Sequence, residues 1–275
     1  MPVPRIVALD IDGTLISSTK QILDFTRSEI HRVVAEHGAR IVLVTARGPE
    51  STAVVEERLG VPASFVTYGG ALVQQRTADG LRDVAETPIP RDEVLALAAA
   101  AREAGAHLGL YARDEWIVSD VDYWALREAR NTAVWPSERT VDELLAADEP
   151  VFKVMLRGAA PVIADAAARA RGLALPLFVH AGREIIEVFS EGAVKLRALA
   201  LLGAAAGFRL DEVIAFGDTE SDAAMLGASG VGVLMGNARP DLEVAPQVIR
   251  TLSNDEDGIG VMLRRQFPTA RPFRP

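Results

Sequence analysis

The sequence has no cysteine, few aromatic residues and no long apolar segment. The absence of Cys among its 275 residues excludes disulfide bonds and thiolate metal sites, and fits a reducing compartment. Aromatic residues make up only 5%, so alanine, valine and leucine must fill the core. The longest uncharged alanine-leucine stretch, residues 198–208, is shorter than the roughly 20 residues that a membrane-spanning helix needs. Residues 1–5 lead directly into the first expected strand, unlike a signal peptide, so we expect a cytoplasmic protein with no membrane partner.

An excess of positive charge is also missing. With 29 Lys and Arg against 38 Asp and Glu, the net charge is -9. Nucleic-acid phosphates require a basic face, so we expect no nucleic-acid partner. The basic residues include only three lysines, Lys20, Lys153 and Lys195. A lysine retained in an arginine-rich chain indicates a role for a compact point charge, although for Lys153 we predict a solvated position on a strand face.

The chain does contain an alternation of apolar runs and helical patterns. Hydrophobic residues make up 49%, and a chain of this length is expected to bury roughly 70–75% of its unfolded surface, in about two domains. Apolar β-branched runs predict buried strands, and apolar residues spaced three or four apart predict helices. The expected order is strand 6–9, helix 24–37, strand 40–45, helix 49–60 and strands 64–67 and 71–74. This βαβαβ order predicts an α/β fold with a doubly wound, Rossmann-like parallel sheet.

The doubly wound pattern is interrupted and then resumes. Residues 83–186 contain all three tryptophans, helices at 91–104 and 162–171, a half-exposed strand at 152–156 and a hairpin at 177–188. A helix at 195–206 and strands at 212–217 and 230–235 then continue the first pattern. We therefore predict a core domain of residues 1–82 and 187–275 with an inserted α/β domain of residues 83–186. The tail from Arg264, rich in arginine and proline, is predicted to be loosely held.

Polar residues stand where the expected parallel strands end. Asp10 and Asp12 follow the strand at 6–9, Thr45 ends the second strand, and Asp218 follows the strand at 212–217. The carboxyl ends of parallel strands meet at one edge of a sheet, and a carboxylate cannot lie unpaired in an apolar core. Lys195 opens a helix, whose N-terminus favours anions. Acids for a metal, beside a turn at Gly13 whose N–H groups can cradle an anion, predict phosphoryl chemistry.

These motifs resemble the haloacid dehalogenase (HAD) superfamily, in its Cof-like branch of phosphatases with a large α/β cap. The matching segments are 10–14 (Asp-Ile-Asp-Gly-Thr), 43–47 (Leu-Val-Thr-Ala-Arg), 192–195 (Gly-Ala-Val-Lys), 217–222 (Gly-Asp-Thr-Glu-Ser-Asp), 233–238 (Val-Leu-Met-Gly-Asn-Ala) and 254–258 (Asn-Asp-Glu-Asp-Gly). The first segment alone is moderately specific, whereas the ordered set covers the chain and is strongly specific. The resemblance implies a HAD core, with residues 83–186 as the cap that selects the substrate.

The resemblance implies catalytic roles for both aspartates of the first segment. Asp10 would attack phosphorus and form an aspartyl-phosphate. Asp12 would protonate the leaving oxygen and then deprotonate the attacking water. Mg²⁺ would be held by Asp10, the main-chain carbonyl of Asp12, and Asp218, with waters completing its octahedron.

Other residues would support the phosphate and the metal in the same resemblance. Thr45, Gly13 and Ser221 would lie beside the phosphoryl oxygens. Lys195 would offset charge so that a carboxylate can attack an anion. Asp222 would orient Lys195 or a metal-bound water.

Three positions depart from the family pattern. Asn is usual where this chain has Ser221 and Gly69, and Gly is usual where it has Ala46. Ser221 offers one donor on a shorter arm, and Gly69 lacks a side chain that could face the substrate. The departures leave the nucleophile and the metal-binding acids in place, so they bear on catalytic efficiency and on contacts to the phosphate.

The function that we expect is Mg²⁺-dependent hydrolysis of a small phosphorylated metabolite, such as a sugar phosphate. Two alternatives stay open from the sequence: a phospho-ligand-binding or regulatory protein with vestigial activity, and a phosphotransferase or mutase. Carbon–halogen cleavage does not need the second acid, Asp12, because a halide leaves without a proton. The tryptophans at 116, 124 and 135 either line a substrate pocket or fill the core of the cap.

Overall fold

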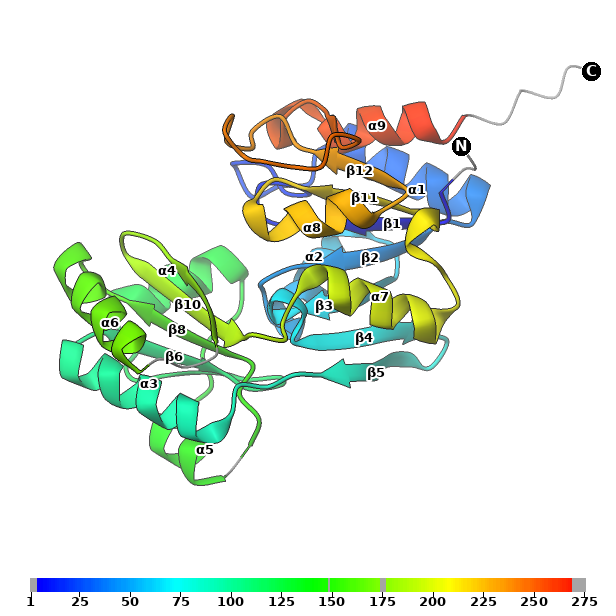
Figure 1. The fold of residues 1–275 in the computed structure, drawn as a ribbon. Helices are drawn as coiled ribbons and strands as arrows, with labels where there is room; N and C mark the ends of the chain where they lie inside the picture. The colour runs from blue at the N-terminus through cyan, green and yellow to red at the C-terminus, as the bar shows by residue number, and fades with distance from the viewer. Residues whose placement is uncertain (1–3, 148, 174–176, 269–275) are drawn as a thin grey trace, which may run out of the picture. The chain divides into compact units, whose positions relative to one another are not determined.

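The computed structural model describes residues 4–147, 149–173 and 177–268, with the backbone alone for 177–181. The chain forms two units, which are considered separately below (Figure 1). Unit 1 comprises Met1–Thr45, Thr52–Ala85 and Val194–Pro275, and unit 2 comprises Ala46–Ser51 and Glu86–Ala193.

Unit 1 is built on a sheet of eight strands in the order β13-β12-β11-β1-β2-β3-β4-β5. The strands are β1 (Ile6–Leu9), β2 (Arg40–Val44), β3 (Ala63–Thr67), β4 (Leu72–Thr77), β5 (Gly80–Glu86), β11 (Val213–Gly217), β12 (Val231–Leu234) and β13 (Ile249–Arg250). Strands β13 to β3 run parallel, and β4 is antiparallel to β3. The prediction of a doubly wound parallel sheet is therefore confirmed from β13 to β3, and β4 departs from it by running antiparallel.

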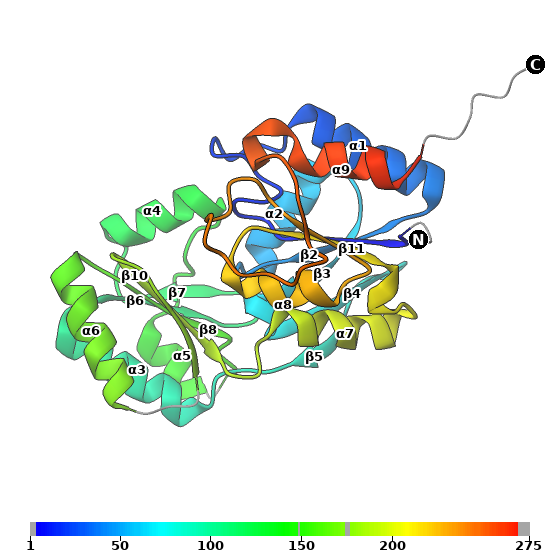
Figure 2. The same ribbon diagram turned by 45° about the horizontal axis from the view of Figure 1, so that its top comes forward.

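Helices cover both faces of this sheet. They are α1 (Asp24–His37), α2 (Pro49–Leu59), α7 (Lys195–Ala206), α8 (Glu220–Ala228) and α9 (Gly258–Gln266). Side chains alternate along a strand, so Val7 and Leu9 pack with residues of α1, α2 and α9, whereas Ile6 and Ala8 pack with residues of α7 and α8. Figure 2 shows α1 and α9 side by side. With both faces covered, strand β1 is fully buried, and polar groups can reach water only beyond the strand ends.

The C-terminal segment corrects one prediction. The structure places Arg264 in α9, where its guanidinium donates to Glu29 Oε1 at 2.6 Å. Phe267 is fully buried in the core. The prediction of a loose tail from Arg264 is therefore wrong up to residue 268, because apolar residues of α9 pack against the sheet. Residues 269–275 lie outside the described part of the chain.

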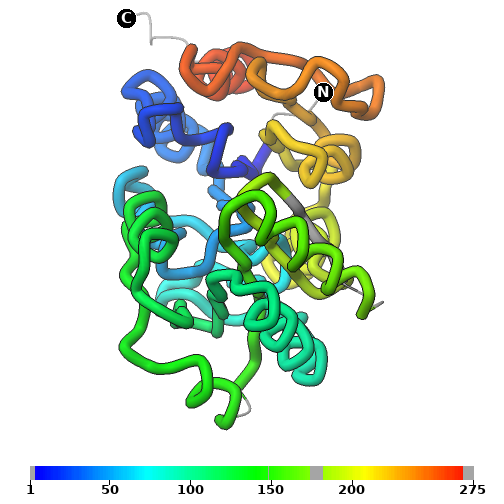
Figure 3. Tube along the Cα trace, turned by 90° about the vertical axis from the view of Figure 1, so that its left-hand side faces the viewer, coloured from blue at the N-terminus to red at the C-terminus, as the bar shows by residue number. Residues whose placement is uncertain are grey.

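Unit 2 has a five-stranded sheet in the order β7-β6-β8-β10-β9. Its elements are β6 (His107–Tyr111), β7 (Trp116–Val118), β8 (Lys153–Arg157), β9 (Leu177–Ala181), β10 (Ile185–Ser190), α3 (Arg91–Ala104), α4 (Tyr123–Thr132), α5 (Val141–Ala147) and α6 (Ala160–Gly172). Helices α3 and α6 lie side by side and form a core with one face of the sheet (Figures 1 and 3). The hairpin predicted at 177–188 is confirmed by the antiparallel pairing of β9 with β10.

The other face of this sheet carries a buried cation. Lys153 is only 3% exposed, with Nζ 3.1 Å from Glu187 Oε1 and 4.0 Å from the centroid of the Tyr111 ring. The predictions of a solvated Lys153 and of a half-exposed strand are therefore wrong. A carboxylate and an aromatic face together compensate a charge that is removed from water.

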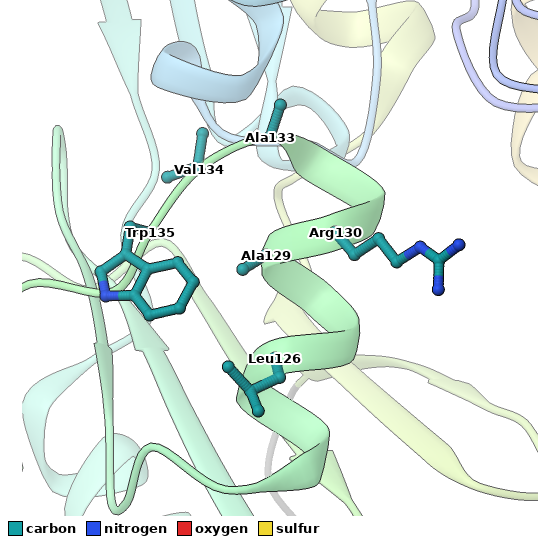
Figure 4. A pocket seen from close by; sticks show the side chains of 6 residues that line it. All are labelled: Leu126, Ala129, Arg130, Ala133, Val134 and Trp135. Atoms are coloured by element: carbon teal, nitrogen blue, oxygen red, sulfur yellow. The ribbon is translucent and has the colours of Figure 1, made fainter.

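The three tryptophans have different environments. Trp116 is buried and stacks on Tyr111, with ring centroids 5.8 Å apart, so it fills the interior of unit 2. Trp124 is half-buried, with the Arg127 guanidinium 5.7 Å from its ring centroid. Trp135 is 64% exposed and lines a hollow of about 340 Å³ beside α4. Figure 4 shows the Arg130 side chain pointing away from Trp135, so the hollow is lined mainly by apolar atoms.

Crossing a bilayer takes one apolar helix of about 20 residues. No helix in the described part of the chain combines that length with the necessary apolar character.

Candidate active site

Three neighbouring strands of unit 1 end in the polar residues singled out from the sequence. Asp10 follows β1, Thr45 follows β2 and Asp218 follows β11. Strand β1 pairs in parallel with both β2 and β11, and the Asp10 N–H donates to the Phe216 carbonyl oxygen at 3.1 Å. The three ends are therefore adjacent at the carboxyl edge of the sheet, where ligands of doubly wound folds bind.

Lys195 joins two of the acids through its ammonium group. It is the first residue of α7 and is 5% exposed, with Nζ 2.8 Å from Asp10 Oδ1 and 2.7 Å from Asp222 Oδ1. Burial opposes the charged form, but the two carboxylates outweigh it and raise the pKa of Lys195. The ammonium therefore remains charged at neutral pH.

Asp222 is the anchor of this arrangement. It is fully buried in the first turn of α8, and its Oδ2 accepts from the Asp218 N–H, the Thr219 N–H and the Thr219 hydroxyl at 3.2, 3.0 and 2.9 Å. Its Oδ1 accepts from Lys195. Both oxygens are thus already engaged, so the geometry gives Asp222 the task of holding Lys195 and the turn after β11.

The acids form a cluster suited to a divalent cation. Ligand atoms of Asp10, Asp218 and Asp222 all lie within 4.8 Å of one another. Burial has the largest effect on the pKa values of Asp10 and Asp218. It raises the pKa of Asp10, and it raises the pKa of Asp218 to about 6. Because Asp222 is occupied by hydrogen bonds, Asp10 and Asp218 are the carboxylates that could hold an ion. Hard oxygen donors of this kind fit Mg²⁺.

Gly13 permits the close approach of the loop after β1 to Asp218. It adopts a left-handed conformation with φ of 81°, and a Cβ at this position would lie 2.3 Å from Asp218 Oδ2. The Thr14 hydroxyl donates to Asp218 Oδ1 at 3.0 Å, and Asn237 Nδ2 donates to the Gly13 carbonyl oxygen at 2.8 Å. Sequence reasoning assigned no role to Thr14 or Asn237, although both stand inside matching segments.

We expect Gly13→Ala to damage the site and the fold more than the replacement of a glycine with open surroundings. The added methyl group requires a strained φ and displaces Asp218, so we expect the unfolding free energy to fall by about 1–3 kcal/mol. Gly38→Ala is the matched control, because Gly38 has a φ of 63° and no atom lies within 4 Å of the place that its methyl group would take. Gly38→Ala is expected to lower the unfolding free energy by about 1 kcal/mol and to leave the acid cluster intact. Urea unfolding compares the two variants, and equal losses would contradict the steric argument.

The remaining predicted residues lie around the cluster in different ways. Thr45 is buried, and its carbonyl oxygen accepts from the Gly69 N–H at 2.9 Å. Asp12 is exposed, and its Oδ1 lies 3.1 Å from Lys20 Nζ. Ser221 is exposed, and its hydroxyl pairs with that of Thr219 at 2.9 Å. In the structure, Lys195 therefore donates hydrogen bonds directly to Asp10 and to Asp222 of α8. The roles of Thr45 and Ser221 in binding phosphate stay predictions.

The pair Gly69–Gly70 has a local structural reason. Gly69 has a φ of 68° and Gly70 a φ of 110°, which are backbone conformations that residues with a side chain rarely adopt. A Cβ on Gly70 would also lie 2.9 Å from the carbonyl group of Val194, the residue before Lys195. The glycines thus allow the loop after β3 to pack against the start of α7.

Comparisons with known proteins place these observations in a family. A family model described as haloacid dehalogenase-like hydrolase matches residues 7–263. Two Bacillus subtilis proteins are each 26% identical: 5-amino-6-(5-phospho-D-ribitylamino)uracil phosphatase YitU, over 96% of this chain and 98% of its own length, and phosphatase YwpJ, over 94% and 99%.

A solved structure shows the same arrangement of the chain. It is a haloacid dehalogenase-like hydrolase from Bacteroides thetaiotaomicron, 27% identical, with a TM-score of 0.82 over 96% of this chain and all of that one. The family match spans nearly the whole chain and includes each strand end that contributes to the acid cluster. The chain belongs to the haloacid dehalogenase-like hydrolases.

Proposed function

We propose that this protein is a Mg²⁺-dependent phosphomonoester hydrolase that works through an aspartyl-phosphate on Asp10. The observation that supports this most strongly is the buried triad in which Lys195 binds both Asp10 and Asp222 beside Asp218. An anionic nucleophile and an anionic substrate repel each other, and a buried ammonium with an adjacent cation site reduces that repulsion.

The first step uses the two aspartates of the β1 loop. Because Nζ of Lys195 bonds Oδ1 of Asp10, we assign Oδ2 as the atom that attacks phosphorus. As the bond from phosphorus to the ester oxygen breaks, Asp12 gives its proton to that oxygen and the alcohol leaves. The phosphoryl group is then bound to Asp10, and Asp12 is a carboxylate.

The second step restores the enzyme. Asp12 takes a proton from a water molecule as the water oxygen attacks phosphorus, and the bond to Asp10 breaks with its electrons returning to the carboxylate. Asp10, Asp218 and the Asp12 carbonyl oxygen would hold Mg²⁺, which would supply positive charge beside the phosphoryl oxygens. We assign Thr45, Gly13 and Ser221 to contacts with those oxygens, and Asp222 to the placement of Lys195.

The substrate that we propose is a small phosphorylated metabolite such as a sugar phosphate, in the cytoplasm. The name of YitU describes a phosphatase that acts on a phosphorylated ribitylamino compound, which is a substrate of this class. We also propose that residues 83–186 are a cap that selects the substrate. The compact unit 2, which holds Glu86–Ala193, supports that division of the chain.

Removal of divalent cations is the first test. Treatment with EDTA is expected to lower the hydrolysis of a panel of phosphate monoesters at least about 100-fold, and added Mg²⁺ is expected to restore it. A circular dichroism spectrum taken in EDTA controls for unfolding. Turnover that persists without a metal contradicts the cation site.

Hydrolysis in ¹⁸O-labelled water separates the alternatives that the sequence left open. A hydrolase transfers one labelled oxygen to inorganic phosphate. A mutase or phosphotransferase moves the phosphoryl group to an acceptor alcohol without the label. A phospho-ligand-binding protein raises its melting temperature with a phosphate ester and releases no phosphate, and that result would overturn the proposed function.

A further inference from the structure

Lys20 forms an ion pair with the proposed acid–base residue. Its Nζ lies 3.1 Å from Asp12 Oδ1, and the two side chains are 50% and 47% exposed. Both residues belong to unit 1 and are only eight positions apart. An exposed pair of this kind contributes little to stability, so stability alone gives no reason for the contact. Because the ion pair involves Asp12, the proposed proton donor, it can affect the proton transfer.

The backbone around Lys20 is held in an unusual conformation. Lys20 has a φ of 62°, in the left-handed region that residues other than glycine seldom occupy. The turn is closed by two hydrogen bonds: the Ser17 N–H donates to the Gln21 carbonyl oxygen at 2.8 Å, and the Lys20 N–H donates to the Ser17 carbonyl oxygen at 2.9 Å. The turn therefore fixes the direction in which the chain carries the lysine.

Contacts from the end of the chain anchor the same turn. The Ser18 N–H donates to Asp255 Oδ1 at 2.8 Å, and Asn254 Nδ2 donates to the Ile16 carbonyl oxygen at 2.9 Å. Asp12 itself forms a β-bridge with Ile16. The segment from Asp12 to the turn is thus held both by its own β-bridge and by hydrogen bonds from residues 254 and 255. The conformation of the turn therefore places Lys20 beside Asp12.

We propose that Lys20 is a positioning residue for Asp12 and matters for esters whose alcohol is a poor leaving group. The inference rests on the proposed function. The ammonium binds Oδ1, so Oδ2 is turned toward the ester oxygen and carries the proton that the alcohol receives. After that transfer Asp12 is an anion, and the adjacent positive charge of Lys20 stabilises it. Lys20 keeps its own protons throughout.

The chemistry of the leaving group gives this role a distinctive signature. A 4-nitrophenolate leaves without help, because its charge is delocalised, whereas an alkoxide must be protonated as the bond breaks. Weakening the acid should therefore slow alkyl esters selectively. A lysine that bound the phosphate would instead lower kcat/KM for aryl and alkyl esters alike.

The experiment compares Lys20→Met, Lys20→Arg and wild type on 4-nitrophenyl phosphate and on glycerol 2-phosphate, at saturating Mg²⁺. The quantity compared is kcat/KM, which covers the steps up to release of the alcohol, so the later action of Asp12 on water does not enter. We expect Lys20→Met to lower kcat/KM for the alkyl ester about 10-fold or more and for the aryl ester less than about twofold. Lys20→Arg should recover most of the loss. Arg27→Met is the control, because it removes an exposed ion pair of the same unit, that with Asp24, away from the cluster.

Each other result counts against the inference. Equal losses of kcat/KM on both esters would assign Lys20 to the fold or the phosphate, and an unchanged kcat/KM for the alkyl ester would make the pair an inert surface contact. In both cases wild-type turnover would leave the proposed hydrolase in place. Wild type that hydrolyses neither these esters nor a wider panel would overturn the hydrolase and, with it, the role of Lys20.

Discussion

Asp10→Asn is expected to lower kcat at least about 10⁴-fold while the protein remains folded. The substitution keeps the size of the side chain but removes the negative oxygen that would bond to phosphorus. No other described carboxylate is equally placed, since Asp222 has both oxygens engaged and Asp218 accepts from Thr14. Steady-state release of phosphate at saturating Mg²⁺ measures the loss.

The same substitution should leave the stability of the metal-free protein nearly unchanged. Burial raises the pKa of Asp10, so ionising this carboxyl costs the folded, metal-free protein free energy, and stability falls as the pH rises from the ordinary pKa of an aspartate to the raised one. Asparagine removes that cost and gives up part of the bond to Lys195, which still has Asp222. Asp24→Asn makes the same change at an exposed helix position, and it controls for effects of the substitution that do not involve the cluster. A near-normal rate in Asp10→Asn would show that the nucleophile lies elsewhere.

The sheet and the acid cluster could be predicted because their signals are local. An apolar run that ends in Asp10, and another that ends just before Asp218, each identify a buried strand and its polar end. Parallel pairing of β1 with β11 then brings the two ends together without further information. The structure agrees with this reasoning at both positions.

Contacts between distant side chains could not be predicted in this way. Asn237 reaches the Gly13 carbonyl oxygen across 224 positions, and nothing in the residues near Asn237 indicates which partner its amide will find. Lys153 looks like a solvated residue on an alternating strand, but Glu187 and Tyr111 from neighbouring strands make its burial tolerable. The burial of a charge depends on its partners, and a pattern in one segment does not contain them.

The C-terminal segment differs from its prediction for a related reason. Arginine and proline are typical of loose tails, and that composition extends from Arg264 onward. The apolar residues Met262, Leu263 and Phe267 carry the opposite signal, because they lie on the side of the segment that meets the core. Where composition and apolar spacing disagree, the spacing reports burial more directly.

Lys195→Met is expected to lower the hydrolysis rate about 10²–10³-fold, the effect of removing one group that stabilises charge in the transition state. Lys195 donates to Asp10 Oδ1 and so both orients the carboxylate and offsets its charge as an anion approaches. Methionine fills a similar volume without a charge. If the rate falls less than about 10-fold in a variant that is still folded, Lys195 does not have this electrostatic task.

The same variant should also lose stability, because two buried carboxylates would then share no cation. Breaking a buried ion pair by removing one partner costs about 3–5 kcal/mol, and the Asp222 and Asp10 side chains are only 0% and 9% exposed. Lys153→Met is the matched stability control: it also removes a buried lysine, but its partner Glu187 is 19% exposed and can be hydrated. We therefore expect the midpoint of urea unfolding to fall further in Lys195→Met than in Lys153→Met. The reverse order would mean that the Lys195 ion pairs stabilise the fold less than the Lys153 pair does, so that the triad contributes to catalysis without holding the carboxyl ends of the strands together.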